Sequence, residues 1–135
     1  MQFEIRREKL NDANIAKIVE LSRQNIYACY QCGMCTASCP SSENMDIPPN
    51  MIVRLIQVGM VDRVLDSRSI WVCTSCFTCF AECPKGIDIA SLTEALRLYH
   101  LRRNIDHLDL SSIPRGELLE LPVIAMVSAL RKFTA

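Results

Sequence analysis

One cysteine pattern occurs twice in the chain and leaves no cysteine over. Each copy reads Cys-x-x-Cys-x-x-Cys-x-x-x-Cys-Pro, first from Cys29 to Pro40 and again from Cys73 to Pro84. The eight cysteines therefore form two matched sets, which are Cys29, Cys32, Cys35 and Cys39, and Cys73, Cys76, Cys79 and Cys83. Any fold of this chain has to present two similar cysteine-rich loops.

This spacing is the ligand pattern of proteins that hold two [4Fe–4S] clusters. Three cysteines separated by two residues can wrap one side of a cubane, whereas the fourth has to come from elsewhere without straining the loop. Pro40 and Pro84 favour an extended conformation at the cysteine before them and turn the chain away from the loop. The pattern therefore predicts crossed ligation, with Cys29, Cys32, Cys35 and Cys83 at cluster I, and Cys73, Cys76, Cys79 and Cys39 at cluster II.

Two other uses of cysteine fit the pattern less well. Structural zinc sites use separate Cys-x-x-Cys pairs or mixtures of cysteine and histidine rather than triplets. Disulfides require an oxidising compartment, and residues 1–10 are charged and have no apolar signal core. We therefore expect two [4Fe–4S] clusters as the cofactors and the cytoplasm as the location.

The rest of the chain predicts helices and no strands, so the expected fold class is all-α, an alpha-helical ferredoxin. Each cysteine motif is followed by an Asp-Ile pair that begins a helix, at Asp46 and at Asp88, and this indicates a duplicated, pseudo-two-fold arrangement. Asp46 and Asp88 are predicted to cap these helices. Apolar periodicity predicts helices over about 12–25 (capped by Asn11 or Asp12 and shielding cluster I), from about 46 to Gly59, over 61–67, 89–103 and 122–132.

Residue patterns also predict which side of each helix is buried. The apolar face of the helix after the first motif is expected to hold Met51, Ile52, Leu55 and Ile56. That of the helix after the second motif is expected to hold Ile89, Leu92, Leu96 and Tyr99. Residues 104–121 are predicted to be irregular.

Composition bounds the partners. The formal net charge is zero, which gives no indication of nucleic acid or of an anionic membrane surface. No apolar run reaches the roughly 18 residues that a membrane-spanning helix needs. Half of the residues are apolar and the mean hydropathy is +0.14, which favours a subunit of a hetero-oligomer over a freely diffusing carrier.

Three regions follow from these patterns: residues 1–28 as an N-terminal arm and helix, residues 29–103 as the duplicated cluster domain, and residues 104–135 as a C-terminal tail. The helix predicted over 122–132 is apolar almost all round and must be covered. Another protein of a complex and the chain's own core are both possible covers, and we expect a partner.

The residues around the clusters suggest that the two sites differ. Gly33 in the first loop is expected to let the backbone approach the sulfurs, whereas the second loop has Phe77 at this position and Phe80 after Cys79. One hypothesis is that cluster II is drier and has the lower reduction potential; alternatively, the aromatic rings only fill space. His100 and His107 are not expected to be ligands, and no catalytic constellation is present.

The double motif, the helix after each copy and the tail from Leu121 to Phe133 together resemble the C subunit of heterodisulfide reductase over nearly the whole chain. The resemblance implies a noncatalytic subunit that relays electrons from the flavin-containing A subunit to the disulfide-reducing B subunit, with the eight cysteines as cluster ligands. The cluster motif alone is similar to that of iron–sulfur subunits of succinate, glycerol-3-phosphate and glycolate dehydrogenases. Another dehydrogenase complex, a stand-alone ferredoxin and an iron–sulfur sensor are thus the alternatives.

Overall fold

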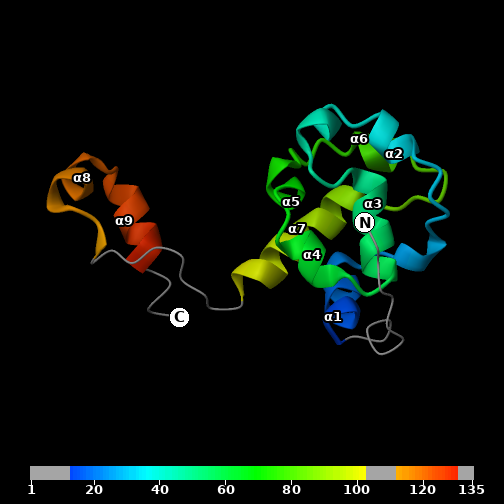
Figure 1. Ribbon diagram of the computed structural model, residues 1–135, viewed down its shortest axis with the longest axis horizontal. Helices are drawn as coiled ribbons and strands as arrows, with labels where there is room; N and C mark the ends of the chain where they lie inside the picture. Colours follow the sequence, from blue (N-terminus) through cyan, green and yellow to red (C-terminus); the bar gives the residue numbers. More distant parts are fainter. Residues whose placement is uncertain (1–12, 103–111, 131–135) are drawn as a thin grey trace. The chain divides into compact units, whose positions relative to one another are not determined.

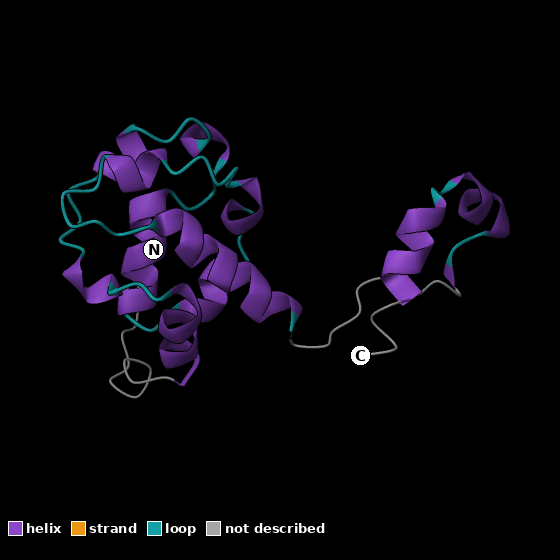
Figure 2. Ribbon diagram, turned by 180° about the vertical axis from the view of Figure 1, so that it is seen from behind, coloured by secondary structure: helices purple, strands orange, loops and turns teal. Residues whose placement is uncertain are grey.

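The computed structural model describes residues 13–102 and 112–130 (Figure 1). The described residues form helices joined by loops, and no strand occurs among them (Figure 2). The prediction of an all-α fold is therefore confirmed. The chain divides into two compact units, 1–103 and 104–135, which are described separately below.

The helices of the first unit follow one another closely. They are α1 (Ala13–Ser22), η2 (Ile26–Ala28), α2 (Met34–Ala37), η3 (Ser42–Asn44), α3 (Pro49–Gln57), α4 (Val61–Leu65), α5 (Ser69–Val72), α6 (Thr78–Ala81) and α7 (Ile89–Leu101). The short helices α2 and α6 lie inside the two cysteine motifs, and the longer helices α3 and α7 follow them. A cysteine loop followed by a longer helix thus occurs twice in this unit.

The core forms around α3 and α7, each of which turns an aliphatic face inward. Ile52, Val53 and Ile56 of α3 are at most 1% exposed, and Leu92 and Leu96 of α7 are fully buried. Full burial of one such side chain contributes roughly 1.5–3 kcal/mol, so these two helices carry much of the stability. The face predicted for α7 is confirmed.

The face predicted for α3 is wrong at one position. Met51 is 37% exposed, and Val53 is buried in its place. The inner face of α3 is therefore rotated from the predicted one, because one side of this helix has to meet the cysteine loops as well as the core.

Helix α1 packs against α7. Its residues Ile15 and Ile18 are buried, and the Tyr99 hydroxyl of α7 donates a hydrogen bond to Asn14 Oδ1. The helix ends at Ser22, earlier than predicted, because Arg23 adopts a left-handed conformation with φ 55°. The caps predicted at Asn11 and Asp12 lie outside the described residues.

The first residues of α3 and α7 show that the predicted correspondence between the two halves of the repeat is wrong. Asp88 caps α7, as predicted, because its carboxylate accepts a hydrogen bond of 3.0 Å from the Ser91 N–H. Asp46 does not cap α3, whose N-cap is Pro48. The structural counterpart of Ile87-Asp88 is therefore Ile47-Pro48, and not the Asp-Ile pair that the sequence suggests.

Asp46 instead holds the start of α5. Its carboxylate accepts hydrogen bonds from the backbone N–H groups of Arg68 (3.1 Å) and Ser69 (3.0 Å) and from the Ser69 hydroxyl. These bonds lower the pKa of Asp46, the Ser69 hydroxyl most of all. A carboxylate placed after the first motif thus fixes the segment that leads into the second.

Helix α3 ends at Gln57, two residues before Gly59, and the predicted role of this glycine in ending it is confirmed. This glycine has φ 81°, and the N–H of Met60 returns to the carbonyl of Leu55 at 2.8 Å. The pattern is a Schellman motif, which favours glycine at the left-handed position. The helix predicted over 61–67 is present as α4.

The second unit contains α8 (Arg115–Glu120) and α9 (Val123–Leu130). Helix α8 shows that the prediction of an irregular segment through 121 is wrong, because Pro114 begins a helical turn that the following residues continue despite Gly116. Helix α9 follows Pro122 as predicted. Among the described helices, none is long and apolar enough to cross a membrane.

Candidate metal centres

The two cysteine loops share one backbone conformation. Gln31 and Gly33 in the first loop have φ of 65° and 82°, and Ser75 and Phe77 at the matching positions of the second have 54° and 60°. These left-handed residues bend the loop around the cysteines before a short helix begins. The cost is strain of about 1–2 kcal/mol at each non-glycine residue.

The backbone conformation of Gly33 gives one reason for a glycine at this position. A Cβ built on Gly33 would meet no protein atom within 4 Å. The left-handed φ therefore favours glycine here, and the predicted approach of the backbone to the sulfurs stays a prediction.

Helices α2 and α6 carry the third cysteine of each loop and pack against each other. Cys35 and Cys79 are each 8% exposed, whereas Cys32 and Cys76 are exposed to solvent. Each loop therefore has one thiol directed to the interior and one at the surface. The two loops form a single body because their short helices are in contact.

Four thiols surround each of two separate recesses. Recess I has a volume of about 320 Å³ including its opening, and recess II one of about 400 Å³. The cysteines that line recess I are Cys29, Cys32, Cys35 and Cys83, and those that line recess II are Cys39, Cys73, Cys76 and Cys79. Cys83 thus lies with the cysteines of the first loop, and Cys39 with those of the second.

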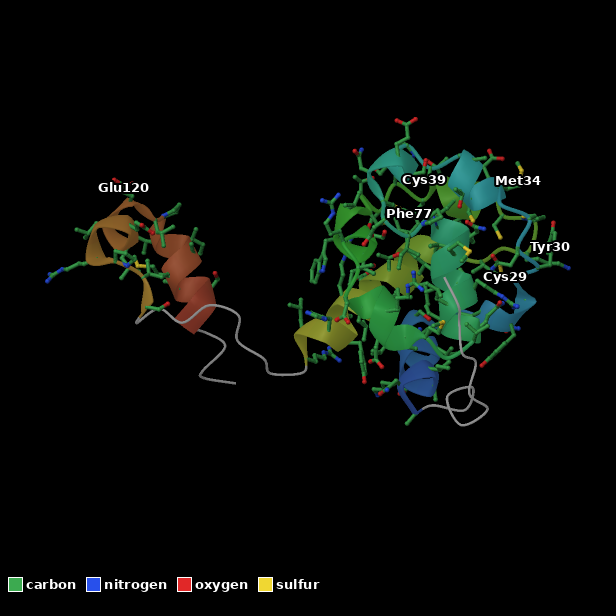
Figure 3. All side chains as sticks on the ribbon, in the orientation of Figure 1. Cys29, Tyr30, Met34, Cys39, Phe77 and Glu120 are labelled. Carbon is green, nitrogen blue, oxygen red and sulfur yellow. The ribbon has the colours of Figure 1, made fainter. Side chains whose placement is uncertain are left out.

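Figure 3 labels residues of both sites: Cys29 and Tyr30 are at one edge of the first unit, and Cys39 and Phe77 are further along it. The Lys85 amine lies 5.8 Å from the centre of the Tyr30 ring. This contact joins the segment after Cys83 to the first loop.

The helices after the motifs supply matching walls. Asn50 and Val53 of α3 line recess I, and Ala90 and Thr93 of α7 line recess II. Both recesses therefore lie beside the beginning of a helix, where the helix dipole favours negative charge. A thiolate-ligated iron–sulfur cluster carries net negative charge and fits this setting. Helix α1, predicted to shield the first site, contributes no residue to the lining of recess I.

Two side chains that the sequence did not single out anchor the loops. The Gln57 side-chain amide donates to the carbonyls of Ile26 (2.7 Å) and Cys29 (3.2 Å). Arg97 occupies the matching place on α7 and donates to the carbonyls of Ile70 and Cys73. We call these two contacts the Gln57 clamp and the Arg97 clamp. Each clamp holds the first cysteine of its loop and the residue three positions earlier.

Several donors point at cysteine sulfurs. In recess I, the Gln31 amide donates to Cys29 Sγ and the Ile87 N–H donates to Cys83 Sγ, each at 3.3 Å. In recess II, the Thr78 hydroxyl lies 3.3 Å from Cys76 Sγ. Such hydrogen bonds stabilise thiolates and tune the potential of a bound cluster.

The thiols differ in acidity. Burial raises the pKa of Cys35 to about 11 and also raises the pKa of Cys79. The hydrogen bond with Thr78 lowers the pKa of the exposed Cys76. Coordination to iron deprotonates a thiol, so the positive metal offsets the cost that burial imposes on these thiolates.

Other residues with ligand chemistry lie apart from the recesses. The His100 ring packs edge-on against Trp71 with centroids 6.0 Å apart and lines neither recess, and His107 lies outside the described residues. Among the described residues, no three Cys, His, Asp or Glu side chains converge closely enough to hold a single ion. The thiols of each recess thus surround a space wider than a mononuclear site.

Comparison with known proteins agrees with this arrangement. Residues 25–87 match the model of the 4Fe-4S dicluster domain, the class that the two four-cysteine sites define. The chain binds two [4Fe–4S] clusters, and such clusters supply one-electron redox chemistry.

The related proteins identify the family within this class. Over 101 residues, the chain is 39% identical to the iron–sulfur C subunit of CoB–CoM heterodisulfide reductase from Methanopyrus kandleri, covering 69% of this chain and 53% of the relative. The C 2 iron–sulfur subunit of the same enzyme from Methanocaldococcus jannaschii is 35% identical, with 69% and 54% covered. The chain belongs to the family of heterodisulfide reductase iron–sulfur C subunits, as the sequence predicts, and spans about half the length of these relatives.

A third relative matches over a shorter stretch. The C2 subunit of the H2/formate:CoB–CoM heterodisulfide, ferredoxin reductase of Methanococcus maripaludis is 34% identical over 68 residues, which cover 44% of this chain and 36% of the relative.

Proposed function

We propose that this chain is the electron-transferring subunit of a heterodisulfide reductase-type complex, without a catalytic site of its own. In this role it passes electrons between a flavin-containing partner of the A type and a disulfide-reducing partner of the B type. The two four-cysteine recesses within one small helical unit support the proposal, because two one-electron centres bound in them would lie side by side.

The proposed ligands are crossed between the motifs. Cluster I is bound by Cys29, Cys32, Cys35 and Cys83, and cluster II by Cys73, Cys76, Cys79 and Cys39. The grouping of the same cysteines around recess I and recess II supports this assignment. The packing of α2 on α6 brings the two loops within reach of each other's fourth cysteine.

The walls of the recesses suit a relay. Ile89, which is 4% exposed, lines both recesses, so its buried side chain lies next to both sites. On the outer side, Cys32 of one site and Cys76 of the other are exposed. We infer that electrons enter one cluster beside one of these cysteines, transfer past Ile89 to the other cluster and leave beside the other cysteine.

The second unit offers a surface for a partner. Val123 and Ile124 of α9 are 70% and 73% exposed, and Leu119 of α8 is 80% exposed. Large apolar side chains so exposed are usual at protein interfaces. We propose that residues 104–135 dock this chain onto another protein of the complex, in the cytoplasm, where thiols stay reduced and available to iron.

The ligand assignment is tested by two matched substitutions. In the Cys39→Ala protein, prepared anaerobically, the EPR signal of cluster II should be lost or altered while that of cluster I persists. The Cys83→Ala protein should show the reverse. If Cys39→Ala instead removes the cluster held by Cys29, Cys32 and Cys35, the crossing is refuted.

The role in a complex is tested by anaerobic affinity purification from the source cells. We expect a flavin-containing chain and a chain with further iron–sulfur centres to co-purify, and to reduce both clusters when the electron donor is added. A lone monomer that exchanges electrons with many acceptors would support a stand-alone ferredoxin. Co-purification with a flavin dehydrogenase that reduces no disulfide would support a role as the iron–sulfur subunit of another dehydrogenase complex.

A further inference from the structure

One hydrogen-bonded network breaks the symmetry between the two sites. The Thr36 hydroxyl donates to Asn50 Oδ1 at 2.7 Å and accepts from the Asn50 backbone N–H at 3.2 Å. The Asn50 side-chain N–H donates to Gln31 Oε1 at 3.4 Å, and Gln31 Nε2 donates to Cys29 Sγ at 3.3 Å. The network therefore runs from α2, through the first turn of α3, to a cysteine sulfur of recess I.

All the side-chain donors in this network point the same way. Because the Thr36 hydroxyl donates to the Asn50 oxygen, the NH2 end of Asn50 faces Gln31. Because the Gln31 oxygen accepts from Asn50, the Gln31 NH2 group faces the sulfur. Donors aligned in series polarise one another, so the last N–H is a stronger donor than an isolated amide.

The second site lacks these side chains. Its loop has Ser75 where the first has Gln31, and Phe80 where the first has Thr36. In the register fixed by the helix starts, Ala90 of α7 stands where α3 has Asn50. In recess II, the Thr78 hydroxyl instead lies 3.3 Å from Cys76 Sγ, and the Thr74 side chain also hydrogen-bonds to this cysteine.

We propose that Gln31, held by Asn50 and Thr36, sets the reduction potential of cluster I above that of cluster II. Reduction adds negative charge that is shared with the sulfurs, and an N–H aimed at a sulfur stabilises the reduced form more than the oxidised form. The inference rests on the ligand assignment proposed above. The sequence predicts the same order of potentials from the aromatic residues of the second loop, but by a different cause.

The test is an anaerobic, EPR-monitored redox titration of the intact protein, with the signals assigned by the Cys39→Ala and Cys83→Ala proteins. Gln31→Met keeps an unbranched side chain and removes the donor. We expect the reduction equilibrium of cluster I to shift about tenfold toward the oxidised form, or about 59 mV for a one-electron couple, with cluster II unchanged. Ser75→Ala is the matched control and should move neither potential.

Three further variants test the inference. Asn50→Ala frees the Gln31 amide, so it should lower the potential of cluster I by less than Gln31→Met, and the double variant should do no more than Gln31→Met alone. Thr78→Val should lower the potential of cluster II only.

If the Gln31→Met protein loads both clusters and their potentials do not change, the inference is wrong. If that protein fails to load, an unchanged cluster I in Asn50→Ala overturns the inference. Failure of the unsubstituted protein to hold two clusters would instead overturn the proposed function.

Discussion

The carboxylate of Asp46 provides the sharpest test of how the fold supports the second site. It accepts three hydrogen bonds at the start of α5, two from backbone N–H groups and one from the Ser69 hydroxyl. Ser69 is fully buried, and its carbonyl in turn accepts a bond from the N–H of Cys73. Asp46→Ala should therefore loosen the segment that enters the second cluster loop.

The expected size follows from the groups left behind. Loss of a helix-capping carboxylate costs about 1 kcal/mol, and a buried N–H without an acceptor costs about 1–3 kcal/mol. Because Arg68 is exposed and can bond to water, we take the total as about 2 kcal/mol, or about 30-fold in the local opening equilibrium.

Hydrogen exchange of the cluster-loaded protein measures this opening without requiring reversible unfolding. Amides of residues 68–73 should lose about 30-fold in protection in Asp46→Ala and clearly less in Asp46→Asn, which keeps an acceptor oxygen. Glu43→Ala, at an exposed carboxylate in the same loop, should leave them unchanged. A change below about threefold in Asp46→Ala would show that solvent replaces the carboxylate and that the argument from burial is wrong.

Three further outcomes follow from the structure. The pKa of Asp46 is lower in the folded protein than its ordinary value of 3.8. The stabilisation by its carboxylate is therefore complete above pH 3.8 and is lost only as the pH falls further. The protection of residues 68–73, relative to that in Asp46→Asn, should be constant from pH 7 to 5 and should decrease once the pH is below about 3.8. Gly33→Ala should lower the free energy of unfolding by about 1–2 kcal/mol through backbone strain, so the cluster absorbance should be lost at a lower denaturant concentration. In Phe77→Gly, the relief of similar strain is offset by the lost burial of the ring, so this denaturant concentration should stay nearly unchanged. Gln57→Leu should speed the loss of cluster I and Arg97→Met that of cluster II, each about tenfold, as followed by EPR after mixing with an iron chelator; equal effects on both clusters would contradict separate clamps.

Local signals predicted much of the fold. The cap at Asp88, the glycine stop at Gly59 and the proline before α9 each act within a few residues, so the chain itself carries the information. The cysteine spacing likewise predicts the three-thiol loops, since three ligands within one turn of chain are a local pattern.

Contacts between residues far apart in the sequence could not be predicted. Asp46 looked like a cap for the next helix, because its true partners lie more than twenty residues further along the chain. The clamps made by Gln57 and Arg97 could be found only once the helix starts fixed which residues of α3 and α7 correspond. A matched polar residue at equal distance from each helix start is the signal that could have indicated them.

Crossed ligation also bears on the order in which a growing chain can acquire its iron. Under the proposed assignment, synthesis as far as Cys79 already supplies every thiolate of cluster II, although its loop is the later one. Cluster I has to wait for Cys83, so the loop made first is the one finished last. The second cubane would then be added to a domain that already holds its first, so the Cys83→Ala chain, which keeps α7, would mature with a single centre.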